Sequence, residues 1–267
     1  MTHKHQALPM AEQVIWLIGA SSGIGAALVG ELQKNCKALI ISARNEDKLQ
    51  EVATGFDNVS IIPVDITQPS TLAQAAQQLT DRFGHIDTLV ANAGTAEYVD
   101  VNHFDAALIR RVHETNFMGL VNCVEAALPL LRKSQSGYIV GVSSSVAYLP
   151  MPRAQAYGSS KAAVSHFLEA MRADLVHLGM DVSIVCPGFV KTPLTDKNDF
   201  PMPMRISAED AARYMVKGMQ KRQFEIHFPK RFSYLLKLIG NLPDFLRLRI
   251  TASMSRAGTP DNKDSHS

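Results

Sequence analysis

Residues 14–25 constrain the fold most strongly, because a strand-length apolar run leads directly into a glycine-rich turn and a helical pattern. The run reads VIWLI at residues 14–18, and the turn reads GASSGIG at residues 19–25. Apolar side chains then recur on one helix face up to Lys34. The order of strand, glycine turn and helix is typical of the first unit of an α/β fold whose parallel sheet binds a nucleotide.

Each glycine of this turn has its own physical task. Gly19 permits the tight turn, Gly23 lets backbone N–H groups approach a pyrophosphate, and Gly25 lets the helix pack closely on the strand. The amino terminus of the helix adds N–H donors and a favourable dipole. A glycine turn alone can be an ordinary loop, but the flanking strand and helix favour a nucleotide site. The residues expected to bind the nucleotide here are Gly19, Ser21, Ser22, Gly23, Ile24 and Gly25.

A tyrosine and a lysine four residues apart, Tyr157 and Lys161, form the second informative motif. On a helix this spacing places both side chains on one face, with Cβ atoms about 5–6 Å apart. A phenol titrates near pKa ~10, and a cation fixed beside it favours the phenolate. We therefore expect Lys161 to lower the pKa of Tyr157, and Tyr157 to exchange a proton with a carbonyl or an alcohol. Taken alone, the pair could also be a surface contact without function.

Together with further motifs, these features resemble the short-chain dehydrogenase/reductase family. The resemblance covers about residues 14–195, and residues 208–228 continue the same domain. Two positions depart from the family pattern, since Ile18 stands where threonine is frequent and Ala91 where asparagine is frequent, but neither removes a catalytic group. The matching motifs are, in chain order, the glycine turn, Asp65, Asn92-Ala93-Gly94, Asn116, Ser144, Tyr157 with Lys161, and Pro187-Gly188 with Thr192.

The resemblance implies an α/β fold with a single Rossmann-type doubly wound parallel sheet in a three-layer α/β/α arrangement. The length of 267 residues suits one such domain. We expect a mobile leader at residues 1–12, the Rossmann-fold dinucleotide-binding and catalytic domain at 13–228, a C-terminal amphipathic helical extension at 229–254, and a mobile tail at 255–267.

The resemblance also implies a catalytic site of Ser144, Tyr157, Lys161 and Asn116. Among three adjacent serines, the usual interval to Tyr157 selects Ser144, whose hydroxyl would stabilise charge on the substrate oxygen. A hydrolase nucleophile is disfavoured, because no Gly-x-Ser-x-Gly elbow surrounds Ser144. The backbone carbonyl of Asn116 is expected to hold a water that relays protons to Lys161.

The choice of nicotinamide cofactor depends on the end of the second expected strand, residues 37–42. NAD-preferring dinucleotide folds usually place an acid about 20 residues past the glycine turn. Ala43 stands at that position here, and Arg44 offers a guanidinium suited to a 2′-phosphate. We therefore expect NADP(H) to be preferred over NAD(H). In the alternative, Arg44 only pairs with Glu46 or Asp47 on the surface.

Other cofactor contacts follow from the resemblance. Asp65 is expected at the adenine, although it could instead cap a helix beginning near Ser70. Val190 and Thr192 are expected near the nicotinamide carboxamide. Beyond the glycine turn, the expected cofactor-binding residues are Arg44, Asp65, Ile66, Asn92, Ala93, Gly94, Tyr157, Lys161, Pro187, Gly188, Val190 and Thr192.

Composition argues against several other classes of protein. The near balance of 27 basic and 25 acidic residues disfavours a nucleic-acid surface. Three widely spaced cysteines in apolar contexts indicate reduced core thiols of a cytoplasmic protein. Residues 1–13 lack the apolar core of a secretory signal, and no run approaches the ~20 apolar residues of a spanning helix. The histidines have no ligand spacing, so we expect no metal.

The C-terminal extension predicts two short, basic, amphipathic helices broken by Gly240 and Pro243. Such helices can lie on an anionic membrane surface, cap a substrate pocket or pack against a sister subunit, and the last two together are favoured. The helical stretches at residues 104–131 and 157–178 hold more apolar positions than one sheet face covers. With the resemblance, this predicts a homodimer or homotetramer.

The leading hypothesis is an NADP-dependent oxidoreductase that transfers a hydride between nicotinamide and a small-molecule carbonyl or secondary alcohol. Phe200, Met202 and Met204 fall where the family's substrate lid begins and suggest an apolar or bulky substrate, although simple packing explains them equally well. One alternative is a peripheral membrane reductase of lipid metabolism, at the inner membrane surface. The other is a nucleotide-binding regulatory protein without turnover, which the intact Ser144, Tyr157 and Lys161 disfavour.

Overall fold

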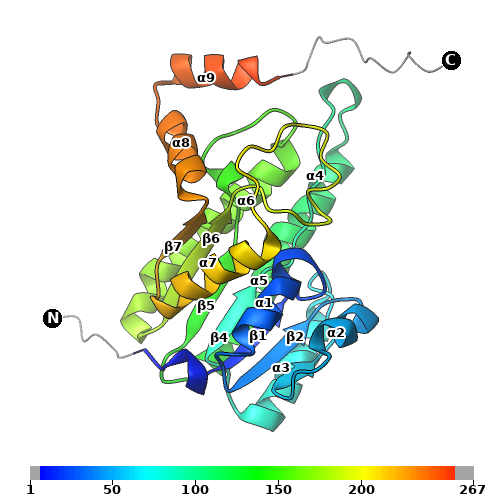
Figure 1. Cartoon of the computed structure of the whole chain (residues 1–267), viewed down its shortest axis with the longest axis vertical. Coiled ribbons are helices and arrows are strands. Elements are labelled where there is room, and N and C mark those ends of the chain that lie inside the picture. Colours follow the sequence, from blue (N-terminus) through cyan, green and yellow to red (C-terminus); the bar gives the residue numbers. More distant parts are fainter. Residues whose placement is uncertain (1–6, 256–267) are drawn as a thin grey trace.

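The computed structural model describes residues 7–255, and their strands form one parallel sheet (Figure 1). The spatial order of the strands is β3-β2-β1-β4-β5-β6-β7. The order therefore reverses between β1 and β4, as in the predicted doubly wound fold. The strands are β1 (Val14–Ile18), β2 (Ala38–Ser42), β3 (Val59–Ile61), β4 (Thr88–Ala91), β5 (Tyr138–Val142), β6 (Asp181–Pro187) and β7 (Glu225–Phe228).

Helices cover both faces of this sheet and complete the predicted three layers (Figure 1). One face is covered by α1 (Gly23–Leu32), α2 (Glu46–Ala53) and α7 (Ala208–Gln220). The other face is covered by α3 (Pro69–Phe83), α5 (Gly119–Leu131) and α6 (Gln155–Leu175), with α4 (Ala106–His113) packed against α6.

The central strands are apolar throughout because both of their faces are buried. In β1, Trp16 packs into the layer of α3, α5 and α6, whereas Ile15 and Leu17 pack into the layer of α1 and α7. The Trp16 indole N–H donates to Ser42 Oγ at 2.9 Å, so the only polar atom of the Trp16 side chain has a hydrogen-bond partner.

Two predicted elements differ from the structure. The apolar run at residues 59–64 predicts a third strand, and the strand in the structure ends at Ile61. Beyond it the N–H groups of Ile62 and Val64 still donate to the carbonyls of Ile41 and Ala43, both at 3.1 Å. The predicted helix at residues 104–131 begins at Ala106 and is interrupted by a π-helical segment at Glu114–Met118, which contains Asn116. Such segments are frequent at functional sites.

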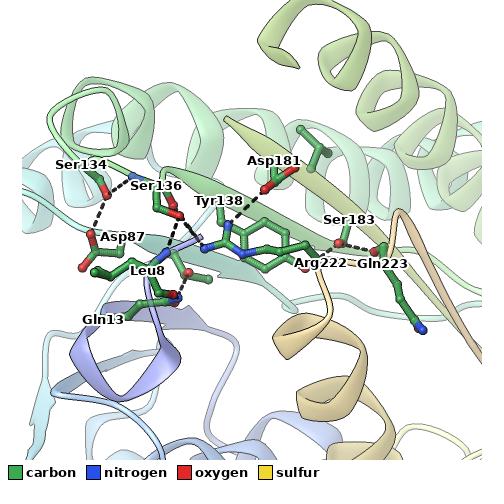
Figure 2. Close-up of polar contacts among 12 residues, drawn as sticks. Leu8, Gln13, Asp87, Ser134, Ser136, Tyr138, Asp181, Ser183, Arg222 and Gln223 are labelled. Atoms are coloured by element: carbon green, nitrogen blue, oxygen red, sulfur yellow. Dashed lines mark hydrogen bonds and ion pairs between the residues drawn. The ribbon is translucent and has the colours of Figure 1, made fainter. Parts of the chain in front are cut away.

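A polar network joins the amino ends of the strands (Figure 2). The Arg222 guanidinium stacks 4.1 Å from the ring centroid of Tyr138, and it donates to Ser136 Oγ at 2.9 Å. Ser136 Oγ also accepts from the backbone N–H of Leu8 at 3.2 Å. The leader predicted to be mobile is therefore held to the sheet at Leu8, because its backbone finds a partner there. Its residues 1–6, and residues 256–267 of the predicted tail, lie outside the described residues.

Asp87 is the buried carboxylate of this network and is 1% exposed. It accepts from the Val14 backbone N–H at 2.8 Å and from Ser134 Oγ at 2.5 Å. Asp87→Ala leaves both donors without their acceptor, so we expect the free energy of unfolding to fall by about 1–3 kcal/mol. Chemical denaturation measures this loss. Asp57→Ala, which removes an exposed carboxylate, is the matched control with an expected change within about 0.5 kcal/mol; equal losses in the two variants would contradict the assigned role.

The C-terminal extension forms two helices, α8 (Lys230–Gly240) and α9 (Asp244–Ser253). Both were predicted, and Pro243 stands directly before α9. In Figure 1 α8 rises from the end of β7, and α9 lies beyond it, away from the sheet. No helix between residues 7 and 255 combines the length and apolar character that crossing a bilayer requires.

Candidate active site

A cleft of about 610 Å³ opens where the strands end. Because the strands are parallel, the residues that follow them meet at this one edge of the sheet. The cleft takes lining residues from the ends of β1, β2, β4, β5 and β6 and from the segment after β3. Predicted site residues that line it are Gly19, Ser21, Ser22, Gly23, Ile24, Arg44, Asp65, Ile66, Asn92, Ala93, Gly94, Ser144, Tyr157, Lys161, Pro187, Gly188, Val190 and Thr192.

The glycine turn has the backbone geometry that its residues require. Gly19 and Gly23 adopt φ of 90° and 54°, in the left-handed region that favours glycine. Gly25 does not line the cleft, and a Cβ on it would lie 1.9 Å from the Gly19 carbonyl oxygen. The same carbonyl accepts from Asn92 Nδ2 at 2.8 Å, which ties the turn to the end of β4. Gly25 thus allows the close packing of α1 on the turn.

The amino end of α1 fits an anionic group. Ser22 precedes the helix, and its side chain makes no capping hydrogen bond to the first turn. The first-turn N–H groups are therefore not satisfied by a cap, and Ser22, Gly23 and Ile24 line the cleft. Such a helix end suits the pyrophosphate of a dinucleotide.

Two cations lie at the β2 end of the cleft. Arg44 is exposed, and within residues 7–255 it makes no ion pair with Glu46 or Asp47. Lys48, in the first turn of α2, lines the same cleft. Sequence reasoning missed Lys48, because Arg44 precedes the helix that carries Lys48 and no helical spacing connects the two. The pair offers two positive charges to a phosphate group.

Tyr157 and Lys161 project from α6 into the cleft, opposite Ser144 at the end of β5. The Lys161 Nζ donates to the Val142 carbonyl oxygen at 2.8 Å and lies beside Gly94, where a Cβ would be 3.3 Å away. Ser144 caps a short 3-10 helix at Ser145–Ala147, and its Oγ accepts from the Val146 backbone N–H at 3.2 Å. The three side chains thus surround one space at the inner end of the cleft.

The electrostatics of this site differ from the sequence prediction. Burial raises the pKa of Tyr157 above its usual range, and a hydrogen bond with Ser144 opposes that rise. Burial also lowers the pKa of Lys161 to about 8. The prediction that Lys161 depresses the pKa of Tyr157 is therefore wrong for the cleft as the structure has it, because the removal of both groups from water is the larger effect.

The three adjacent serines have different surroundings. Ser143 Oγ donates to the Lys161 carbonyl oxygen at 2.8 Å and lies 2.7 Å from Ser165 Oγ, so it joins β5 to α6. Ser145 is buried and does not line the cleft. Ser144 lines the cleft and interacts with Tyr157. The geometry therefore favours the serine that the interval to Tyr157 selected.

Asn116 lies behind the cleft and has a positioning role in the structure. Its Oδ1 accepts from the Thr95 backbone N–H at 2.7 Å, and its Nδ2 donates to the Thr95 carbonyl and to Ser160 Oγ, both at 2.9 Å. Asn116 thereby connects the turn that follows β4 to the helix that carries Tyr157 and Lys161. The water relay through its backbone carbonyl stays a prediction.

Asp65 is not a helix cap, because α3 begins after Gln68. Its Oδ1 accepts from the Thr67 backbone N–H at 3.0 Å and from the Thr67 hydroxyl at 2.8 Å, which forms a tight turn at the cleft wall. Between residues 7 and 255 no group of three or more His, Cys, Asp or Glu side chains could hold a metal ion.

An aromatic wall, made of Tyr98, Phe189, Phe200 and Phe232, lies near Tyr157. Phe189 lies 6.1 Å from Phe200 and 5.4 Å from Phe232, and Tyr98 meets Phe200 edge to face at 5.4 Å. The Tyr98 hydroxyl donates to Asn198 Oδ1 at 2.9 Å, which fixes the predicted lid segment to the loop after β4. Burial, followed by the proximity of Tyr157, raises the pKa of Tyr98 to about 12. Sequence reasoning missed Tyr98, because a loop gives no periodic signal.

Comparison with known proteins decides the family. A family model described as short chain dehydrogenase matches residues 13–201. This chain belongs to that family. An uncharacterised oxidoreductase of Myxococcus xanthus is 30% identical over 239 residues, covering 88% of this chain and 94% of its own length. An 11-beta-hydroxysteroid dehydrogenase 1A of Arabidopsis thaliana is 34% identical over 255 residues, covering 85% of this chain and 72% of its own length.

Solved structures of short-chain dehydrogenases share the fold. One from Burkholderia cenocepacia in complex with NADP has a TM-score of 0.79 at 24% identity, covering 92% of this chain and 99% of its own. One from Burkholderia phymatum in complex with NAD has a TM-score of 0.80 at 22% identity, covering 89% and 95%. The chain is thus a short-chain oxidoreductase that acts on CH–OH donors with a nicotinamide cofactor. Which nicotinamide it prefers has to be argued from its own residues.

Proposed function

We propose that this short-chain dehydrogenase prefers NADP(H) and interconverts an apolar carbonyl compound and its secondary alcohol. The observation that carries the proposal is that Ser144, Tyr157 and Lys161 line the same cleft as the glycine turn and the Arg44–Lys48 cation pair. When bound, the nicotinamide supplies the hydride chemistry.

Each side chain has a task that its surroundings support. Ser144 donates a hydrogen bond to the substrate oxygen and stabilises the charge that develops there. Tyr157 holds a proton at its hydroxyl and gives it to that oxygen, and the raised pKa of Tyr157 keeps the proton in place until it is needed. Lys161, with its ammonium at the cleft wall, attracts the anionic cofactor.

The substrate class follows from the aromatic wall. Phe189, Phe200 and Tyr98 pack on one another near Tyr157, outside the residues that line the cleft. We infer that they present an apolar face to the substrate. Apolar surface of this kind favours a bulky, weakly polar carbonyl compound over a sugar. The relative named an 11-beta-hydroxysteroid dehydrogenase acts, by its name, on a bulky apolar substrate, and this supports the same class.

The test is a panel of carbonyl compounds graded from small polar sugars to bulky apolar ketones, with NADPH oxidation as the readout. We expect kcat/KM to rise with the apolar area of the ketone. A protein that binds NADPH but oxidises it with no member of the panel would favour a regulatory protein without turnover. A preference for polar sugars would contradict the assignment of the substrate class.

The cofactor preference predicts the effect of one substitution. Arg44→Ala removes a charge-assisted contact to the 2′-phosphate, so NADPH should bind about 10- to 100-fold more weakly. The affinity for NADH should stay the same, because NADH lacks that phosphate. Fluorescence titration measures both affinities, and Lys133→Ala removes an exposed cation elsewhere as a control. Equal affinities for NADPH and NADH in the unmodified protein would refute the proposal.

We propose that the protein is a homodimer or homotetramer joined through α5 and α6. Exposed apolar side chains flank these helices, with Met118 40%, Val176 45% and Leu178 59% exposed. Pairing with symmetry mates would remove them from water. Light scattering at micromolar concentration should therefore report a dimer or a tetramer. A monomer at that concentration would contradict the prediction.

We propose a reducing, cytoplasmic environment for the chain. Cys36, Cys123 and Cys186 are buried free thiols. Burial raises the pKa of both Cys36 and Cys186 to about 12, so these thiols are unreactive at neutral pH. Three buried thiols without a disulfide fit a compartment in which thiols stay reduced.

A further inference from the structure

The helix α8 has one buried face and one exposed face. Its inner face packs on the active-site loops, since Phe232 and Leu236 are buried and Phe232 contacts Phe189. On the same side Lys237 pairs with Glu225 and stacks 4.8 Å from the ring centroid of Tyr148. The inner face therefore holds α8 to the loops that follow β5 and β6.

The outer face of α8 is apolar and exposed, and the Tyr234 ring at its edge meets the His227 ring edge to face at 5.0 Å. Tyr234, Leu235 and Leu238 are 56%, 49% and 65% exposed. Arg231 precedes Tyr234 by three residues, Leu235 by four and Leu238 by seven. At these spacings the four side chains share one side of the helix. Large apolar side chains that gather on one exposed face indicate a contact surface, because their exposure to water is unfavourable.

The helix α9 extends this surface. None of its ten residues is buried, and Phe245, Leu246 and Leu248 are 73%, 40% and 60% exposed. Isolated helices shorter than about 12–15 residues are marginal in water. In Figure 1 α9 lies across the end of α8, away from the sheet, so the domain does not cover it. A helix of this kind is stable when another surface covers its apolar side chains.

The net charge of the C-terminal extension indicates what kind of surface covers these apolar side chains. Residues 229–254 hold five basic side chains and one acid, a net charge of +4, whereas the whole chain has a net charge of +2. The rest of the molecule therefore carries −2. Lys230, Arg231 and Arg249 form no ion pair with any residue between 7 and 255. Free cations among exposed leucine and phenylalanine side chains complement a surface that is both anionic and apolar.

We propose that the outer surface of α8 and α9 binds the surface of an anionic phospholipid bilayer. Leu235, Leu238 and Phe245 enter the boundary between headgroups and acyl chains, while Arg231 and Arg249 contact lipid phosphates. A second copy of the chain is a poorer occupant. In a two-fold contact through this patch, residues 229–254 of one copy, with a net charge of +4, would face the same residues of the other copy, and the like charges would repel.

Cosedimentation of the full chain with vesicles tests the proposal. Phosphatidylglycerol/phosphatidylcholine vesicles should bind the protein, pure phosphatidylcholine vesicles should bind it much more weakly, and salt should reduce the binding. Arg231→Gln/Arg249→Gln should lower the partition coefficient about 30-fold, from the contribution of two cations near the surface. Arg132→Gln/Lys133→Gln, which removes two exposed cations elsewhere, should leave partitioning unchanged.

A second pair of variants tests the apolar contribution. Leu238→Ser/Phe245→Ser should lower partitioning at least tenfold, whereas Val101→Ser/Phe104→Ser, at 57% and 63% exposure, should not. An unchanged NADPH affinity shows that each variant is folded. Absence of binding to anionic vesicles overturns the proposal. The proposal is also overturned if Leu238→Ser/Phe245→Ser leaves vesicle binding unchanged and alters only the oligomer size or the KM. The patch would then be a subunit contact or a substrate cap.

Discussion

Replacement of Ser144 by alanine is expected to lower kcat/KM about 10²- to 10³-fold, the loss that follows removal of one donor to a developing oxyanion. Ser144 lines the cleft and hydrogen-bonds Tyr157 in the structure. Its hydroxyl is therefore available to the same substrate oxygen that receives the Tyr157 proton. Steady-state rates with NADPH and the best ketone of the panel measure the loss, and NADPH affinity should stay the same.

The neighbouring serines provide matched controls for this prediction. Ser145→Ala should keep near-normal turnover, because Ser145 does not line the cleft. Ser143→Ala should lower stability more than rate, because its hydroxyl bonds the Lys161 carbonyl and Ser165 within the fold. A Ser145→Ala enzyme that is inactive while Ser144→Ala turns over would show that the alignment of this loop is wrong by one residue.

Strands and the glycine turn could be predicted from the sequence for a simple reason. A strand buried on both faces is an unbroken apolar run, so β1 and β2 were predicted to within one residue at each end. Parallel strands then place the residues after them at one edge. The cleft could therefore be predicted from local patterns, although the chain that lines it spans residues 18–195.

Features that depend on tertiary contact could not be predicted in this way. The role of Asn116 depends on a π-helical segment and on contacts with Thr95 and Ser160, none of which has a local pattern. Tyr98 reaches Tyr157 from a loop. The pKa of Tyr157 depends mainly on how completely the fold removes its hydroxyl from water. The spacing along a helix predicts which side chains lie next to Tyr157, but it does not predict this burial.

Tyr157→Phe should nearly abolish turnover and leave cofactor binding intact. The substitution keeps the ring and its packing but removes the hydroxyl that carries the proton. General acid–base groups typically contribute about 10²- to 10⁴-fold, so we expect a loss of rate in that range. Cofactor titration alongside steady-state rates separates the two effects. A Tyr157→Phe enzyme with near-normal turnover would remove Tyr157 from the mechanism.

Lys161→Met should behave differently, because the Lys161 ammonium acts on the anionic cofactor. Since burial lowers the pKa of Lys161 to about 8, its charge is present below pH 8 and is lost above it. NADPH should therefore bind the unmodified protein more weakly as the pH rises through 8. Lys161→Met should bind NADPH weakly at every pH and lose this dependence, whereas Tyr157→Phe should keep it. A pH profile of NADPH affinity that is unchanged in Lys161→Met would show that the cofactor does not contact this ammonium.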